Sequence, residues 1–282
     1  MSSAAIRTID VRQLGRERVV CAFLVGDVLV DCGPASRVHT LLEELGDVRP
    51  RVLALTHIHL DHAGATGLLV ERWPELEVWV HEVGAPHLVD PSRLLASATR
   101  LYGEDMERLW GEVRPVPEAN LRVLRGGEAL AEFEVAYTPG HASHHVSYWH
   151  PPTRTAFVGD VAGVRMAPSS YVLAPTPPPD IDVEAWQDSI ARLRSWHPEQ
   201  LAITHFGCFD DVPAHLDAIE RSLALAARRA RELSVEEFVA ATRADIEADA
   251  GGRVAPVYAL GAPLEQTYAG LKRYWSKRDG EQ

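Results

Sequence analysis

Three histidines and one aspartate fall within six consecutive positions of the stretch LTHIHLDHAG, as His57, His59, Asp61 and His62. Imidazole and carboxylate groups cost free energy to desolvate unless a partner compensates them. Both groups are ligands for first-row divalent metal ions, and a high share of imidazole favours zinc. The stretch therefore predicts part of a metal site.

The spacing within this stretch predicts two directions for its side chains. His57 and His59 are two residues apart, so they point to the same side of an extended backbone. Asp61 and His62 then fall at the start of a helix and can turn toward a second point. One run of chain could in this way contribute ligands to two metal ions.

Further polar residues follow three other apolar runs. His141 ends FEVAYTPGH, Asp160 ends TAFVGD, and His205 follows QLAIT. Ligands in layered α/β folds bind beyond the carboxyl ends of strands, so strands of one sheet could bring these residues to one edge. Five histidines and two aspartates are too many ligands for one tetrahedral ion. They suit two divalent ions that share a carboxylate.

The elements that would position these residues alternate between strands and helices. Strands are expected at 19–25, 28–32, 51–57, 77–81, 133–141, 145–149, 155–160 and 200–207, and helices at 36–46, 63–73 and from 182. From Val212 onward the pattern is helical, and Ser234 with Glu237 forms a capping box. The order predicts an α/β layered fold. We expect a catalytic domain at residues 1–210 and a helical accessory region at residues 211–282.

The polar motifs together resemble those of the metallo-β-lactamase fold superfamily. HIHLDH matches its HxHxDH signature, and PGH at His141, GD at Asp160 and THFG at His205 follow in the expected order. The resemblance covers roughly residues 19–209. It implies an αββα sandwich, here with a C-terminal helical extension.

The resemblance also implies roles for the ligands. His57, His59 and His141 would bind the first metal ion. Asp61, His62 and His205 would bind the second, and Asp160 would bridge both. The cofactors would be two divalent ions per chain, with zinc favoured and iron or manganese as alternatives. Asp31, within DCG, would be a structural element outside the ligand set.

Such a pair of ions predicts a hydrolase. Divalent ions lower the pKa of a shared water toward neutrality, which gives a hydroxide that can attack a carbonyl carbon. We expect cleavage of a carboxylic ester, thioester or lactone, with Asp160 bridging the ions and either Asp61 or a group outside the ligand set passing a proton to the leaving group. Glyoxalase II-like thioesterases and acyl-homoserine-lactone lactonases share this ligand set and are the relatives whose activity we expect.

Two other classes of function stay open. Persulfide dioxygenases resemble glyoxalase II and bind a single iron at the three-histidine site, and the same residues suit iron. A non-catalytic binding module that keeps the fold is the other alternative, although an intact ligand set argues against it. Two features of the sequence differ from the lactonases and the glyoxalase II relatives. Lactonases often have a tyrosine just after the bridging aspartate, whereas here the next tyrosine is Tyr171. Glyoxalase II relatives hold glutathione with basic residues, whereas Arg165 is the only basic residue between Asp160 and Arg192.

The composition of the chain argues against some classes of binding partner. The chain of 282 residues has a formal net charge of −12, which argues against nucleic acid and anionic membranes as partners. The three cysteines form no CxxC pair, and the first residues resemble no signal peptide, so a cytoplasmic location is expected. The helical tail could cover the site or form a homodimer.

Apolar residues in two loops predict a small-molecule substrate with an apolar acyl part. These loops span residues 84–118 and 164–181. Their apolar residues are Leu94, Leu95, Leu101, Tyr102, Leu109, Trp110, Met166 and Tyr171, of which part should be core.

The remaining candidate ligands carry weaker expectations. We expect His39, His81, His87, His150, His197 and His215 to be ordinary solvated or capping residues. His145 stands where relatives place a further histidine and could lie at the edge of the site, whereas His144 has no expected role. Cys208 is expected to be a small buried residue.

Overall fold

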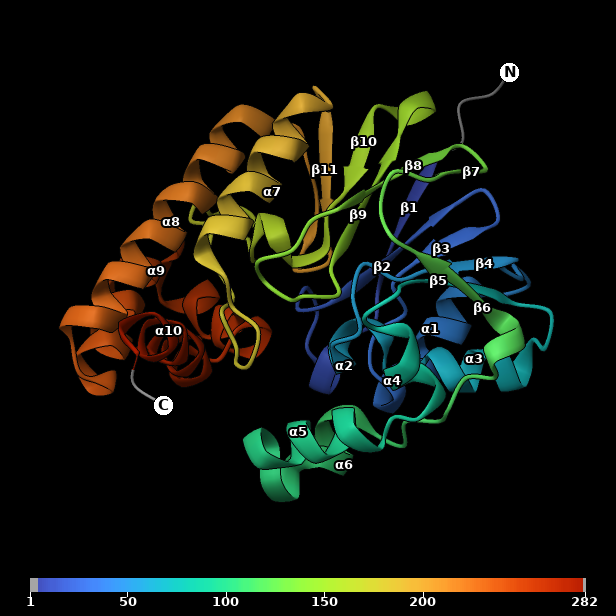
Figure 1. Cartoon of the computed structure of the whole chain (residues 1–282). Helices are drawn as coiled ribbons and strands as arrows, with labels where there is room; N and C mark the ends of the chain where they lie inside the picture. Colours follow the sequence, from blue (N-terminus) through green and yellow to red (C-terminus); the bar gives the residue numbers. More distant parts are fainter. Residues whose placement is uncertain (1–4, 281–282) are drawn as a thin grey trace. The chain divides into compact units, whose positions relative to one another are not determined.

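The chain folds into two compact units in the computed structural model, which describes residues 5–280. Unit 1 contains the described residues up to Tyr137 together with His144–Phe157. Unit 2 contains Thr138–Ser143 and the described residues from Val158 onward. Figure 1 labels most of the helices and strands along the chain.

A six-stranded mixed sheet forms one layer of unit 1. Its strands, in spatial order, are β1 (Ile6–Asp10), β2 (Cys21–Val25), β3 (Val28–Val30), β4 (Val52–Ala54), β5 (Glu77–His81) and β6 (Leu121–Leu124). The first three are antiparallel and the pairs from β3 to β6 are parallel. Parallel neighbours need crossover connections, which α1 (Val38–Leu45) and α3 (Thr66–Arg72) supply here. The predicted alternation is confirmed, with β1 and β6 as additions.

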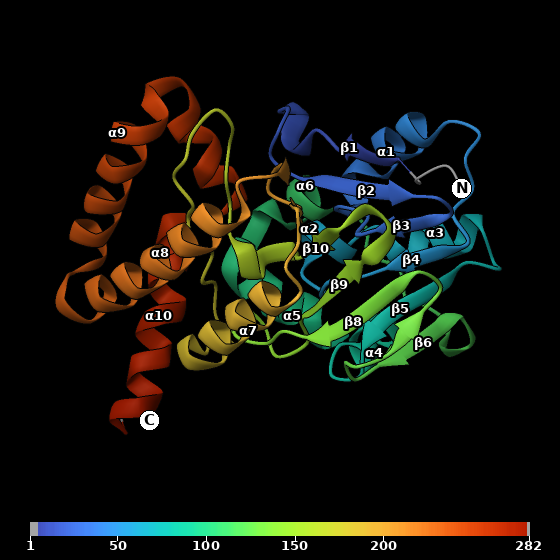
Figure 2. The same ribbon diagram turned by 90° about the horizontal axis from the view of Figure 1, so that it is seen from above.

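Four antiparallel strands form the other layer of unit 1. They are β7 (Ala129–Leu130), β8 (Phe133–Tyr137), β9 (Val146–His150) and β10 (Thr155–Phe157). Aromatic side chains join the two layers, since the rings of Phe23 and Phe157 lie 5.5 Å apart and the Tyr148 hydroxyl donates to Leu55 O at 2.7 Å. The core of unit 1 therefore sits between the two layers (Figure 2).

Short helices connect β5 to β6. They are α4 (Ala85–Val89), α5 (Ser92–Tyr102) and α6 (Met106–Trp110). The chain then returns close to α3, because a Cβ at Gly67 would lie 2.2 Å from Arg114 O. Only glycine allows backbones to approach this closely.

Unit 2 consists of a hairpin and four long helices. The elements are α7 (Val183–Ser195), β11 (Gln200–Ile203), β12 (Gly207–Phe209), α8 (Val212–Glu232), α9 (Val235–Gly261) and α10 (Leu264–Asp279). Asp182 caps α7 by accepting from Ala185 N at 3.0 Å, and the Ser234–Glu237 capping box begins α9 as expected. Gly251 interrupts α9 with a φ of 72°, which kinks the helix.

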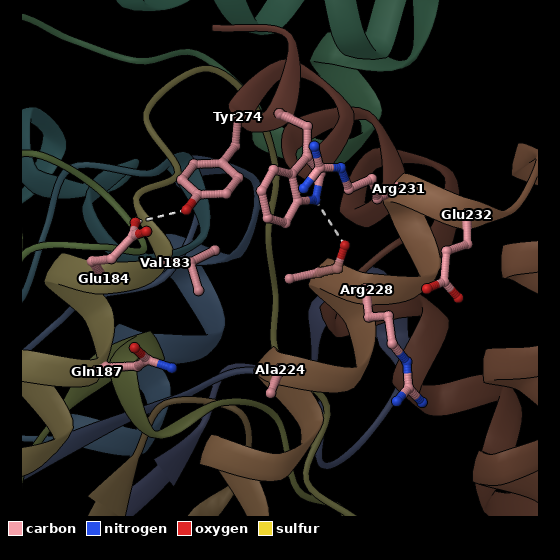
Figure 3. Close-up of a pocket in the computed structure, with 10 residues that line it drawn as sticks. Val183, Glu184, Gln187, Ala224, Arg228, Arg231, Glu232 and Tyr274 are labelled. Carbon is pink, nitrogen blue, oxygen red and sulfur yellow. Dashed lines mark hydrogen bonds between the residues drawn. The ribbon is translucent and has the colours of Figure 1, made fainter. Parts of the chain in front are cut away.

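Aromatic contacts tie α10 to α7 and α8. The Tyr274 hydroxyl donates to Glu184 at 2.6 Å, and the Trp275 indole donates to Ala227 O at 2.7 Å. A cavity of about 410 Å³ opens between these helices, and Arg228 and Gln187 are among its lining residues (Figure 3). Its lining includes none of the seven predicted metal ligands.

Two findings concern the predicted domain boundary and the apolar character of the helices. The predicted boundary at residue 210 falls between β12 and α8, inside unit 2, and a separate accessory domain stays a prediction. No helix between residues 5 and 280 combines the length and apolar character that crossing a membrane requires.

Candidate metal centre

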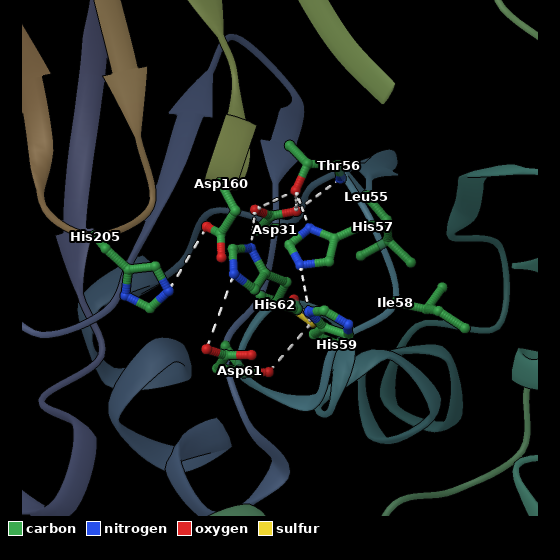
Figure 4. Close-up of polar contacts among 12 residues, drawn as sticks. Asp31, Leu55, Thr56, His57, Ile58, His59, Asp61, His62, Asp160 and His205 are labelled. Carbon is green, nitrogen blue, oxygen red and sulfur yellow. Dashed lines mark hydrogen bonds and ion pairs between the residues drawn. The ribbon is translucent and has the colours of Figure 1, made fainter. Parts of the chain in front are cut away.

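Unit 1 brings together the four predicted ligands of the HIHLDH motif. His57 and His59 lie in the loop after β4, and Asp61 and His62 lie on the short helix α2 (Leu60–Ala63). His57 Nε2 and His59 Nδ1 are 3.0 Å apart, and His62 Nε2 is 3.9 Å from Asp61 Oδ2. The expected arrangement, two imidazoles together followed by a helix start, is the observed one (Figure 4).

The buried carboxylate of Asp31, directly after β3, holds the HIHLDH segment in place. Asp31 is fully buried, and its Oδ1 accepts from Thr56 N while its Oδ2 lies 2.8 Å from His62 Nδ1. A carboxylate beside Nδ1 keeps the proton on that nitrogen, which leaves Nε2 of His62 as the acceptor. Asp31 thus acts as the structural element that the DCG motif suggested.

Unit 2 brings together the other three predicted ligands. His141 lies in the Thr138–Ser143 segment, Asp160 in the 3-10 turn Gly159–Ala162, and His205 in the turn between β11 and β12. Asp160 Oδ2 is 3.5 Å from His141 Nε2, and Asp160 Oδ1 is 3.7 Å from His205 Nε2. One imidazole therefore lies on each oxygen of a single carboxylate.

A hydrogen bond to a backbone carbonyl orients the ring of His141 as well. His141 Nδ1 donates to Pro175 O at 2.8 Å, so Nε2 is again the nitrogen that faces the carboxylate. Both units contain His and Asp side chains that could hold a metal ion. Nitrogen and oxygen donors of this kind, with rings fixed through their second nitrogen, fit a divalent cation.

Two further histidines of unit 1 lie beside His57. His145 is buried with its ring stacked 5.0 Å from that of His57, consistent with a place at the edge of the site. The ring of His144 stacks 6.1 Å from the same imidazole, and its Nδ1 accepts from Ile58 N at 3.3 Å. His144 therefore holds the backbone between the first two predicted ligands, a role that its sequence position did not indicate.

Three histidines expected to be solvated or capping are buried instead, so that prediction is wrong for them. His81 stacks on Tyr137 with ring centres 4.4 Å apart, and His150 packs against Phe133. His215, on α8, is 1% exposed. Cys208 is half-buried on β12 rather than fully buried.

His215 belongs to a network that supports the turn of Asp160. Its Nε2 donates to Ala162 O at 2.8 Å, and its Nδ1 lies 3.2 Å from the guanidinium of Arg165. Arg165 in turn donates to Asp211 at 2.7 Å and lies over the ring of Phe209. Burial lowers the pKa of His215 from 6.5 to about 4, and the nearby Arg165 acts in the same direction.

This pKa predicts how acid destabilises the fold. The imidazole of His215 has a pKa of 6.5 in the unfolded chain and of about 4 in the folded chain. The stability that His215 contributes is therefore fully present above pH 6.5 and is lost as the pH falls toward 4. By pH 5 the loss should be on the order of 2 kcal/mol. His215→Gln should therefore show a smaller drop in free energy of unfolding between pH 7.5 and pH 5, measured with urea.

The exposed His197 offers the control for this measurement. His197→Gln should keep the pH dependence of the unmodified protein, because this side chain lies outside the buried network of His215. Equal slopes for the His215→Gln variant and the unmodified protein would contradict the assignment of this acid sensitivity to His215.

Comparison with known proteins places this geometry in a family. The family model of the metallo-beta-lactamase superfamily matches residues 15–205. The metallo-beta-lactamase fold-containing protein ST1585 of Sulfurisphaera tokodaii is 26% identical over 189 residues, which cover 64% of this chain and 68% of that protein. A hydroxyacylglutathione hydrolase of Legionella pneumophila is 28% identical over 110 residues, and the match spans 39% of this chain and only 33% of the hydrolase.

Solved structures show the same fold. The crystal structure of ST1585, described as an archaeal metallo-beta-lactamase superfamily protein from Sulfolobus tokodaii, has a TM-score of 0.72 at 20% identity and covers 95% of this chain and 98% of its own. The structure of TTHA1623 in a di-iron-bound form has a TM-score of 0.53 at 28% identity, with coverage of 72% and 93%.

These matches confirm the fold class. The predicted αββα sandwich with a C-terminal helical extension agrees with the family model and with the archaeal structure. The matched region also contains all seven predicted ligands, from His57 to His205. The chain belongs to the metallo-beta-lactamase superfamily.

Proposed function

We propose that the protein is a dinuclear metal-dependent hydrolase that cleaves a carboxylic ester, thioester or lactone. The observation that carries this proposal is the carboxylate of Asp160, which has His141 on one oxygen and His205 on the other. A carboxylate that bridges two ions needs one oxygen for each. Membership of a superfamily whose relatives include named hydrolases supports the same reading.

The proposed ligand roles follow the superfamily motifs. The first ion would be held by His57, His59 and His141, the second by Asp61, His62 and His205, and both by Asp160. When bound, such ions supply Lewis acidity toward a carbonyl oxygen and lower the pKa of water. Zinc is the metal we favour for this donor set, with iron or manganese as alternatives.

The two aspartates of this set differ in access to solvent. The side chain of Asp61 is 20% exposed, whereas that of Asp160 is 4% exposed. A group that passes a proton to a leaving group must reach it. We therefore assign proton transfer to Asp61 and a purely coordinating role to Asp160.

An apolar cluster next to the ligands supports a substrate with an apolar acyl part. Leu60 lies between His59 and Asp61, and it is buried in a cluster with Ala98 and Trp110. Four of the predicted loop residues pack against this cluster while staying partly exposed: Leu94, Leu95, Tyr102 and Leu109. Met166 is only 2% exposed and belongs to the part of the set that is core. Small-molecule specificity, a cytoplasmic location and a homodimer remain predictions.

The test combines metal content with a substrate panel. Protein purified without chelator should carry about two divalent ions per chain, and it should hydrolyse esters, thioesters or lactones faster as the acyl chain lengthens. Chelator-treated protein is the control and should regain activity when zinc returns. One iron per chain, with no second ion taken up and with oxygen consumed on a persulfide, would replace this proposal by persulfide oxidation.

A further inference from the structure

The last residue of α9 lies against the ring of His205. A Cβ built at Gly261 would be 3.3 Å from His205 Nδ1 and 3.4 Å from Val164 Cγ1. The first distance is tighter than most real Cβ contacts, so the ring would have to move by a few tenths of an ångström. The other nitrogen of this ring, Nε2, faces Asp160 at 3.7 Å. A side chain added at Gly261 that moves the ring would therefore also move Nε2, the nitrogen that faces Asp160.

The same helix also holds the loop that follows Asp160. The carboxylate of Asp249 accepts from Ser169 Oγ at 2.5 Å, from Ser170 N at 2.9 Å and from Tyr171 N at 3.0 Å. Tyr258, nine residues further along α9, donates its hydroxyl to Tyr171 O at 2.8 Å. These bonds secure residues 169–171 to α9.

That loop in turn holds the backbone of His205. Arg165 N donates to His205 O at 2.6 Å, and Phe206 N donates to Arg165 O at 3.2 Å. The guanidinium of Arg165 donates to Ser169 O at 3.0 Å, which connects the two ends of the loop. Helix α9 thus reaches His205 by two routes, one through the ring and one through the backbone.

We propose that α9 positions His205 and thereby sets the affinity of the second metal ion. This inference rests on the proposed dinuclear function. It gives residues 235–261 a part in the metal centre that their place in a C-terminal helical extension does not suggest. Gly261, Asp249 and Tyr258 are positioning residues in this scheme, because they act through His205 and through the loop beside it.

Two glycines on α9 provide a matched test. Gly261→Ala places a methyl group against His205, whereas Gly252→Ala adds the same group where nothing lies within 4 Å. Each variant is dialysed against graded chelator and its metal content is measured. We expect Gly261→Ala to bind its second ion about tenfold more weakly with the first ion unaffected, and Gly252→Ala to match the unmodified protein.

The Co(II)-substituted proteins add a readout that general loss of stability would not move. The absorption bands of the second ion should shift in Gly261→Ala and stay unchanged in Gly252→Ala. Should Gly261→Ala fail to fold, Asp249→Ala decides, because it acts through the loop and leaves the ring contact intact. Glu247→Ala, an exposed acid on the same helix, is its control.

The outcomes separate this inference from the proposed function. Equal second-ion affinity in Gly261→Ala and the unmodified protein overturns the positioning role and leaves the hydrolase proposal standing. Weaker binding in the variant, together with no hydrolysis across the substrate panel, supports the positioning role and rejects the hydrolase. An unmodified protein that takes up no second ion overturns both.

Discussion

Replacing His59 with alanine is expected to reduce hydrolysis by the metal-loaded protein at least about a hundredfold. His59 is half-buried, and its Nδ1 lies 3.0 Å from His57 Nε2, so the change removes one of two adjacent donors. A metal ion contributes several kcal/mol to stabilising developing charge, and each 1.36 kcal/mol corresponds to a tenfold change in rate. Initial rates on the best substrate of the panel, together with metal content, measure the effect.

His39 provides the control for this variant. It is an exposed histidine on α1 in the same unit, and His39→Ala should keep both metal content and rate. Thermal unfolding checks the fold of His59→Ala, because replacing a half-buried loop residue should lower the stability of the protein only slightly. Turnover by His59→Ala equal to that of the unmodified protein would exclude a mechanism in which this imidazole holds a catalytic ion.

Asp31→Asn is expected to weaken metal binding by about ten- to a hundredfold and to destabilise the fold. The carboxylate accepts from Thr56 N at 2.8 Å, contacts the Thr56 hydroxyl and orients His62. An amide keeps the shape but loses the charge, and its N–H₂ group cannot accept from all these donors. Changes in groups that orient metal ligands cost this much affinity, and a buried unsatisfied donor costs about 1–3 kcal/mol.

Asparagine is the right replacement because Asp31 has a φ of 55°. Asparagine tolerates this left-handed region well, so the variant tests hydrogen bonding rather than backbone strain. Asp27→Asn is the matched control, since Asp27 forms an exposed ion pair with Arg51 that should contribute less than about 1 kcal/mol. Metal titration and urea unfolding of both variants give the comparison, and equal losses in the two would contradict a special role for Asp31.

Local patterns in the sequence were sufficient to predict most elements near the ligands. The apolar run before His57 and the following helix start place that histidine and Asp61 in their observed positions, because both depend on neighbouring residues only. Strand β6 was missed because its side chains are largely exposed and its position depends on pairing with β5. Short edge strands of this kind carry little periodicity of their own.

The spacing of apolar residues around His215 in the sequence indicates that this histidine is buried, although we expected it to be solvated or capping. Val212, Leu216 and Ile219 form an apolar stripe on α8, and His215 lies three residues after the first and four before the last. That spacing places the imidazole on the buried face. The contact between Gly261 and His205 had no such signal, since it joins residues 56 positions apart and follows from tertiary packing alone.

The path of the chain between the units limits how this protein can be cut or recombined. The chain enters unit 2 for Thr138–Ser143, returns to unit 1, and passes to unit 2 again at Val158. A fragment ending at Phe157 would contain all ten strands from β1 to β10, yet its His141 would lack Pro175 and Trp186, which contact that imidazole. Neither unit is therefore one continuous segment that could be transferred to another protein by a single crossover. During translation, His141 is synthesised before the residues that orient it.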